Sequence, residues 1–286
     1  MTSAPQQRSE AIAALEANYF DMYRLIGGPV GCRVVETAAF LAVSTPVRVA
    51  PFNSVLRFQG GEGDRAERDL DEALGVFEGR DVPIVFIVHP TAGPPDLRER
   101  LARRGFALAE TLSGMAKVLD GEDMGRPPLP AGVSIVEGDV RHGVDWIGLT
   151  SWRYGMTEED RAYLAALYEL EFAHGDRALV ACRDGVALSK AELHVHDRVA
   201  GIYGVVTHDT GRRLGLATAV TVAALGHALE AGATAAILHA TPAAVGLYER
   251  LGFASVAEFE VWAEPDRLFR SVAAGLRAER ARKRRA

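Results

Sequence analysis

Residues 199–253 read VAGIYGVVTHDTGRRLGLATAVTVAALGHALEAGATAAILHATPAAVGLYERLGF, and this stretch decides the fold of the chain. It begins with the strand-like run Val199–Thr207 and passes through a turn rich in Gly and Arg into an Ala-rich helix that stops at Gly232. A second apolar strand, Ala235–His239, and a short helix carrying Tyr248 follow. This alternation of strands and helices is typical of an α/β domain.

The turn before the Ala-rich helix reads Arg212-Arg213-Leu214-Gly215-Leu216-Ala217-Thr218. Backbone N–H groups at a helix start lack partners and carry partial positive charge, so a phosphate binds well there. Gly215 and Ala217 let an anion approach the backbone, and Arg212 and Arg213 add charge. The spacing fits neither a nucleotide P-loop nor the dinucleotide fingerprint G-x-G-x-x-G. The turn therefore predicts an anion site of another kind.

The pattern Arg212-x-x-Gly215-x-Ala217 resembles the pyrophosphate loop R/Q-x-x-G-x-G/A of the GCN5-related N-acetyltransferase (GNAT) family. The closing signature of that family is matched, at the expected distance, by Tyr248-Glu249-Arg250-Leu251-Gly252-Phe253. The resemblance implies an N-acetyltransferase that moves an acetyl group from acetyl-CoA to an amine by direct attack in a ternary complex. The alternative is a non-catalytic acyl-CoA-binding sensor.

The resemblance also implies where acetyl-CoA binds. The pantetheine arm would pair with the end of the strand Val199–Thr207, and the pyrophosphate would lie on the turn. The implied cofactor residues are Val205, Val206, Thr207, Arg212, Arg213, Leu214, Gly215, Leu216, Ala217 and Thr218. Tyr248 matches the family's tyrosine near the thiol sulfur, a candidate general acid, with an aromatic that only packs on the core as the alternative.

A general base is harder to assign. Many family members use a glutamate on the central strand, and Val199–Thr207 contains none. Glu192 on the preceding strand is the candidate, with a solvent-facing carboxylate as the alternative. His194 and His196 share its strand face by the period of two. A metal site made by these histidines is the less favoured interpretation, because acetyl transfer needs no metal, and we expect none.

Trp152 and Tyr154 are the candidates for the acceptor pocket, or they connect the two halves of the chain. Glu169 and Glu171 could hold a substrate cation, or they are solvated helix carboxylates. The acceptor itself, a small-molecule or peptide amine, is not identified by the sequence, since this fold serves many acceptors.

The first 120 residues repeat the order strand, helix, strand, helix and end in Gly105-Phe106. The position of the phosphate loop there is occupied by residues 60–69, which carry four carboxylates, and Leu101 stands where Tyr248 stands. We therefore predict an α/β fold of two tandem GNAT-like domains, each a mixed, mostly antiparallel sheet flanked by helices. The predicted parts are a degenerate domain without a cofactor site (1–120), a linker (121–132), a catalytic domain (133–263) and a basic C-terminal helix (264–286).

Further elements follow from local patterns. Residues 1–8 are expected to be a mobile arm, with Ser9 capping a helix over Glu10–Leu25, and another helix is expected near Val140–Leu149. Thr157-Glu158-Glu159-Asp160 predicts a capping box. The remaining expected strands are Arg33–Glu36, Ala39–Val43, Ser54–Phe58, Ile84–Val88, Ser113–Leu119, Val133–Glu137, Arg177–Arg183 and Val186–His196, and the remaining helices Arg65–Phe77 and Asp96–Arg104.

The 286 residues suffice for two cores, and the net charge of −6 argues against a general nucleic-acid or membrane binder. The basic run from Arg280 to Arg285 could contact nucleic acid, but solvated cations at a helix end explain it better. The two cysteines are too few for a disulfide framework or a cysteine zinc site. We expect a cytoplasmic protein with no membrane contact, and leave a homodimer open.

Overall fold

The structure, a computed structural model, describes residues 4–121, 125, 127–139 and 144–267. Among the described helices, none is long and apolar enough to cross a bilayer. The helices are α1 (Ala4–Ile26), α2 (Asp64–Gly75), α3 (Leu97–Arg103), α4 (Ile147–Tyr154), α5 (Glu158–His174), α6 (Leu216–Glu230) and α7 (Val245–Arg250), with 3-10 turns η1 (Ala50–Phe52) and η2 (Asp209–Gly211). The strands are β1 (Arg33–Glu36), β2 (Leu41–Ser44), β3 (Asn53–Leu56), β4 (Val85–Val88), β5 (Ala107–Val118), β6 (Val133–Glu137), β7 (Arg177–Arg183), β8 (Val186–His196), β9 (Val199–Thr207), β10 (Ala235–Ala240) and β11 (Ala254–Ala263).

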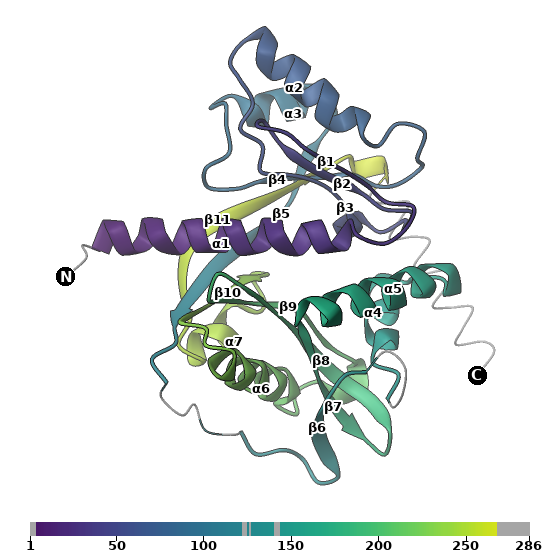
Figure 1. Ribbon diagram of the computed structural model, residues 1–286, viewed down its shortest axis with the longest axis vertical. Coiled ribbons are helices and arrows are strands. Elements are labelled where there is room, and N and C mark those ends of the chain that lie inside the picture. Colours follow the sequence, from purple (N-terminus) through teal and green to yellow (C-terminus); the bar gives the residue numbers. More distant parts are fainter. Residues whose placement is uncertain (1–3, 122–124, 126, 140–143, 268–286) are drawn as a thin grey trace.

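All eleven strands belong to one mixed sheet with the order β1-β2-β3-β4-β11-β5-β10-β9-β8-β7-β6 (Figure 1). Only the pairs β3–β4 and β9–β10 are parallel. The predicted mixed, mostly antiparallel α/β architecture is therefore confirmed. The two halves of the chain also exchange strands, since β5 of the first half lies between β10 and β11, and β11 lies between β5 and β4. This exchange joins the two expected sheets into one.

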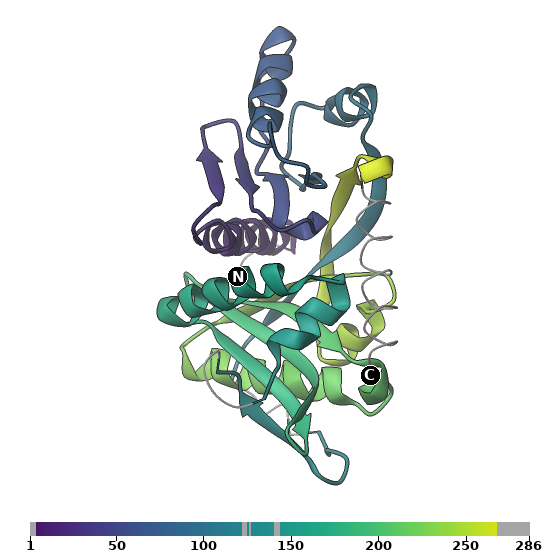
Figure 2. The same ribbon diagram turned by 90° about the vertical axis from the view of Figure 1, so that its right-hand side faces the viewer.

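Helices cover both faces of the sheet. Helices α6 and α7 pack on the β7–β10 region with an apolar cluster that includes Leu193, Val220 and Tyr248. On the opposite face α4 and α5 share a second cluster with α1, which crosses between the two halves (Figures 1 and 2). A third cluster lies under α2 and α3. Because α1 precedes the first strand and yet contacts β8 and β9, the first half covers one face of the second.

The local patterns predicted most of these elements. Strands β1, β6, β7, β8 and β9 have the predicted bounds, and β7, β8 and β9 form the expected antiparallel meander. The capping box is also confirmed, because the Thr157 side chain accepts from the Asp160 N–H and the Asp160 carboxylate accepts from the Thr157 N–H.

Two predictions about helices, and the predicted mobile arm, were wrong. Helix α1 begins at Ala4, so Ser9 lies inside it and residues 4–8 are helical rather than a mobile arm. In the segment predicted as a helix over Val140–Leu149, residues 140–143 lie outside the described part and α4 starts only at Ile147. Residues 144–146 are not helical, and the buried Trp146 indole donates to the Asp139 carbonyl at 3.1 Å.

Strand β11 was not predicted, although its Glu258-Phe259-Glu260-Val261 alternates as a half-buried strand does. Helical backbone resumes at Pro265, near the start of the predicted C-terminal helix, and residues 268–286 lie outside the described part.

Candidate functional site

The strands β9 and β10 separate at the centre of the second half. They pair in parallel at only three positions, Val199 to Gly201 against Ala235 to Ile237. Beyond these positions β9 continues to Thr207 and β10 to Ala240 without pairing to each other. The edge of β9 that faces β10 therefore offers backbone N–H and C=O groups to a ligand over its last residues, where Val205, Val206 and Thr207 were predicted to bind the cofactor arm.

A bulge bends β9 at the start of this open edge. Gly204 and Val205 together face the single residue Ala191 of β8. Gly204 has a φ of +54°, which favours glycine, and a Cβ there would lie 2.4 Å from Glu192 Oε2. The Glu192 carboxylate therefore lies directly against the bulge.

After β9 the chain turns through η2 into α6, and this turn holds the predicted anion loop. Gly215 has a φ of +75° and nothing within 4 Å of a Cβ position, so the space beside it is open. Within the described residues, the N–H groups of Arg213, Leu214 and Gly215 donate to no carbonyl, and those of Leu216 to Thr218 form the unpaired first turn of α6. Six successive N–H groups are thus available to an anion.

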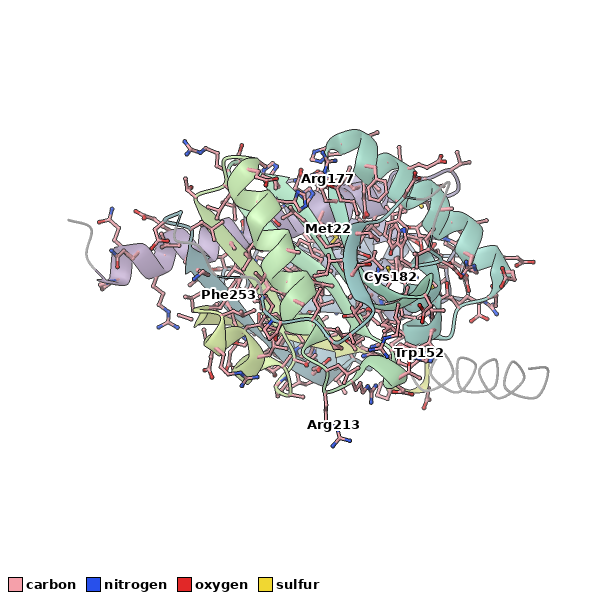
Figure 3. All side chains as sticks on the ribbon, turned by 90° about the horizontal axis from the view of Figure 1, so that it is seen from below. Met22, Trp152, Arg177, Cys182, Arg213 and Phe253 are labelled. Carbon is pink, nitrogen blue, oxygen red and sulfur yellow. The ribbon has the colours of Figure 1, made fainter. Side chains whose placement is uncertain are left out.

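The two arginines of the loop behave differently. Arg212 pairs with Asp209 at 3.0 Å, and both side chains are largely exposed. Arg213, with a φ of +60°, projects from the molecule in Figure 3. Because the Arg213 guanidinium is exposed, its donors are available to a phosphate that binds at the loop.

Tyr248 on α7 is buried among the side chains of the α6 face and packs against Phe253, with ring centroids 6.0 Å apart. Burial raises the pKa of its phenol to about 12. The phenol therefore stays protonated at neutral pH and holds a proton that it can donate. Within the described part of the chain its hydroxyl makes no hydrogen bond.

Glu192 lies on the other face of the sheet and is neither solvent-facing nor isolated. Its carboxylate accepts from the Lys190 ammonium, and from the Tyr168 hydroxyl at 2.8 Å. Lys190 is fully buried and lies over the rings of Trp146 and Tyr168, at 5.3 and 5.1 Å from their centroids. The sequence did not indicate this charged pair, because an alternating strand gives no sign that a lysine points inward.

Residues 145–253, which contain α4, α5, the separated strands, the anion loop and α7, match the family model described as the acetyltransferase (GNAT) family. These residues are a GNAT domain. No curated protein matches the chain.

Solved structures extend the likeness to most of the chain. A GCN5-related N-acetyltransferase from Kribbella flavida is 21% identical with a TM-score of 0.65, covering 88% of this chain and 95% of that chain. A tandem GNAT protein from the clavulanic acid biosynthesis pathway, solved without AcCoA, is 17% identical with a TM-score of 0.57, covering 89% and 94%. At such identities the likeness concerns the fold, and the tandem GNAT architecture is confirmed at that level.

The two predicted acceptor residues lie in different surroundings. Trp152 on α4 packs against His208, which follows β9, at 4.7 Å between ring centroids. Tyr154 packs edge-on against Phe52 of the first half at 6.1 Å, and burial raises its pKa to about 12. Tyr154 thus contacts the other half of the chain, whereas Trp152 lies beside the end of the proposed cofactor strand.

Sequence reasoning missed a set of rings where β9 and β10 separate. The Tyr203 hydroxyl donates to Asn18 Oδ1 of α1 at 2.7 Å, and its ring stacks with His239 of β10 at 6.4 Å. Tyr19 of α1 lies 4.3 Å from the same histidine ring. Asn18 and Tyr19 come from the first half, so no local pattern could place them in the GNAT domain's interior.

His239 gives a pH-dependent prediction. Both of its ring nitrogens are buried and have no hydrogen-bond partner among the described residues, and burial lowers its pKa from 6.5 to about 3. Between pH 6.5 and about pH 3 the histidine is protonated in the unfolded chain but neutral in the folded chain. The free energy of unfolding is therefore highest above pH 6.5 and decreases as the pH falls. From pH 7 to pH 5 the wild type should lose about 2 kcal/mol more unfolding free energy than His239→Phe.

Urea denaturation of both proteins at the two pH values measures this difference, and any constant packing effect of the phenyl ring cancels. His227→Gln, which changes a half-exposed histidine on α6, serves as the control and should follow the wild type. Equal pH dependence of His239→Phe and the wild type would contradict the buried neutral ring.

A cavity of about 600 Å³ lies away from this region, between the first part of α1 and the loop at Pro90 and Thr91. Its lining includes Glu16, which bonds to His89 at 2.8 Å and to the Thr91 N–H and hydroxyl. None of the predicted site residues lines it. The cavity is therefore separate from the predicted cofactor site at the separated strands.

Proposed function

We propose that the protein is an N-acetyltransferase that binds acetyl-CoA in its GNAT domain and transfers the acetyl group to the amine of a small molecule or peptide. The observation that carries this proposal is the open edge of β9 running directly into the unpaired N–H groups before α6. An extended amide-containing arm ending in a pyrophosphate matches both parts, because the edge pairs with amides and the helix start with phosphate.

In this proposal the pyrophosphate lies on the N–H groups from Arg213 to Thr218, with Arg213 as an added cation. The pantetheine amides pair with the backbone of Val205 to Thr207. The thioester then lies beside the bulge at Gly204, with Tyr248 near the sulfur and Glu192 behind the bulge.

The chemistry follows from these positions. The acceptor amine attacks the thioester carbonyl directly, the tetrahedral intermediate collapses, and the thiolate leaves as CoA. Tyr248 supplies the proton for that thiolate, and Glu192 is the proposed base that takes the proton from the amine. Much of the rate would come from holding amine and thioester together.

The first half of the chain supports the fold but, we propose, not a second cofactor site. The Gly61 N–H, which would face an anion at the corresponding loop, donates to the Asp69 carboxylate at 2.9 Å. Asp64 and Glu67 occupy the first turn of α2 and would repel a phosphate. Leu101 on α3 is fully buried and has no proton to donate.

Acetyl transfer is tested with Tyr248→Phe. We expect the release of free CoA from acetyl-CoA, followed with a thiol reagent across a panel of amines, to fall about 100-fold, the scale of a general acid. The affinity for acetyl-CoA, measured by calorimetry, should stay within about threefold of the wild type, since the phenol is not a phosphate or amide contact.

Tyr23→Phe is the matched control, because it removes another buried phenol, one on α1 of the first half that donates to the Pro51 carbonyl, and it should keep full turnover. If the wild type binds acetyl-CoA but acetylates none of the amines, the sensor alternative is correct. If it does not bind acetyl-CoA, both readings of the GNAT domain are wrong.

A further inference from the structure

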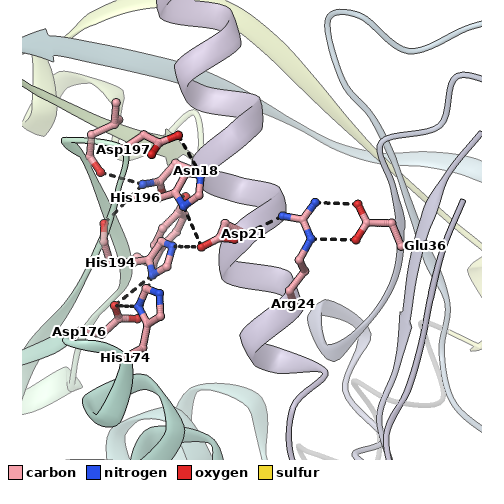
Figure 4. A network of polar contacts seen from close by, with 11 residues as sticks. Asn18, Asp21, Arg24, Glu36, His174, Asp176, His194, His196 and Asp197 are labelled. Atoms are coloured by element: carbon pink, nitrogen blue, oxygen red, sulfur yellow. Dashed lines mark hydrogen bonds and ion pairs between the residues drawn. The ribbon is translucent and has the colours of Figure 1, made fainter. Parts of the chain in front are cut away.

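A second cluster of chemically active side chains lies where α5 ends and β7 begins, on the face of β8 that α1 covers (Figure 4). Two imidazole rings lie within hydrogen-bonding distance of the Asp176 carboxylate. His194 Nδ1 lies 2.9 Å from Asp176 Oδ2, and His174 Nδ1 lies 3.1 Å from Asp176 Oδ1. One donor atom from each of these three residues falls within 4.8 Å of the others.

The far side of His194 faces a second carboxylate. Its Nε2 lies 3.3 Å from Asp21 Oδ2 of α1, and the same oxygen lies 3.1 Å from His196 Nδ1. Within the described residues Nε2 makes no hydrogen bond, so Asp21 lies near it without accepting its proton, and the hydrogen bond of His194 is the one between Nδ1 and Asp176. A metal ion bound to Nδ1 would take the place of that proton and leave an Nε2–H facing the nearby Asp21 carboxylate.

We propose that His174, Asp176 and His194 bind a divalent transition metal ion of the zinc class. Two imidazole nitrogens and one carboxylate oxygen form a donor set that such ions prefer, and a water would complete a tetrahedral shell. We expected no metal from the sequence, and the metal site weighed there used His194 and His196. The fold instead brings His174 and Asp176, at the end of α5, against His194 of β8.

Two of the three donor separations already suit an ion, and the two imidazole nitrogens, within 4.8 Å of each other, would need to move to a similar spacing. Ligand bonds of about 2.0–2.1 Å place tetrahedral donors roughly 3.3 Å apart, close to the contacts that Asp176 already makes with the two imidazoles. Gly175, with a φ of +112°, ends α5 in the left-handed form and carries the chain from His174 to Asp176. Asp176 and His194 are buried, whereas the His174 side chain is 38% exposed and gives the ion a route from solvent.

The site would connect the two halves of the protein. Asp21, which orients His194, belongs to α1, and Arg24 one turn later pairs with Glu36 of β1 at 2.7 Å (Figure 4). A bound ion would therefore stiffen the position of α1 over β8. This proposal does not depend on acetyl transfer, because none of its residues belongs to the proposed acetyl-CoA site.

The test is calorimetric titration of ZnCl₂ into the full-length, tag-free, EDTA-treated protein, together with the visible spectrum of the Co²⁺ form. We expect one equivalent to bind with a Kd on the order of 1 µM or tighter, and ligand-field bands of tetrahedral Co²⁺. His174→Ala, at a half-exposed position that tolerates truncation, should weaken binding at least about 100-fold, and Asp21→Asn by about 10–100-fold.

His227→Ala is the matched control. His227 also lies near two carboxylates, Glu137 at 3.7 Å and Glu230 at 3.3 Å, but these three do not converge as the proposed ligands do. It should bind zinc as the wild type does. If the wild type binds no zinc, a proton joins His194 to its carboxylates and the proposal is wrong; equal zinc affinity in His174→Ala and the wild type would also overturn it.

Discussion

The Gly215→Glu variant is expected to lose at least about 100-fold in acetyl-CoA affinity. The space around Gly215 is open, so the new side chain enters the volume in which the pyrophosphate is proposed to lie. There its carboxylate would satisfy the free N–H groups before α6 and repel the phosphates. Calorimetry with acetyl-CoA measures the effect, and raised salt should reduce only the part that comes from charge repulsion.

Two control variants separate charge from strain. Gly215→Gln has the same length and the same unfavourable positive φ without the charge, so it should lose much less affinity than Gly215→Glu. Gly63→Glu places the same carboxylate at the N-cap of α2, where φ is +55° and the space is also open. It should bind acetyl-CoA as the wild type does, because the first half is proposed to have no cofactor site. Wild-type affinity in Gly215→Glu would remove the loop from the cofactor site.

The second large effect concerns the stability of the GNAT domain. Glu192→Gln should lower the unfolding free energy by about 2–3 kcal/mol, because it leaves the Lys190 ammonium buried without its anion. This is less than breaking a fully buried pair costs, since 21% of the Glu192 side chain is exposed. Lys190→Met should cost less, because Glu192 keeps the Tyr168 hydroxyl and some solvent.

Combining the two changes separates the structural role of Glu192 from its catalytic role. The double variant Lys190→Met, Glu192→Gln should recover part of the stability lost in Glu192→Gln, while acetyl transfer stays impaired if Glu192 is the base. Urea denaturation measures the first effect and CoA release the second. A Glu192→Gln variant as stable as the wild type would show that the charged pair does not hold Lys190 in the folded protein.

Local sequence patterns predicted those parts of the fold that depend on interactions between residues close together in the sequence. The meander β7–β8–β9 alternates cleanly and is interrupted by the tight turns at Asp184-Gly185 and Asp197-Arg198, so its bounds could be predicted to the residue. The start of α1 could not, because Ser9 is a good cap but nothing in residues 4–8 prevents the helix from beginning earlier. Helix α4 starts at Ile147, directly after the buried Trp146, which no capping residue in the sequence indicated.

The candidate site likewise contains residues that the local sequence indicates and contacts that only the folded chain creates. Arg212, Gly215 and Tyr248 could be selected from the sequence because anion binding at a helix start depends on neighbouring residues. The surroundings of Glu192 could not, since Tyr168, and the Trp146 ring over which Lys190 lies, reach β8 through long-range packing. For the same reason the contact of Asp21 with His194 has no counterpart in any motif.

The exchange of β5 and β11 also bears on how the protein is made. When β5 leaves the ribosome, both of its sheet neighbours, β10 and β11, are still to be synthesised. The first half therefore cannot complete its sheet as a unit during synthesis, as an independent N-terminal domain would. Strand β4 of the first half pairs with β11 (Ala254–Ala263), and this pairing can form only after residues 119–253 have been translated. Until then the unpaired edges of β4 and β5 can pair with strands of other chains. The nascent chain therefore needs protection from aggregation that the complete sheet no longer needs.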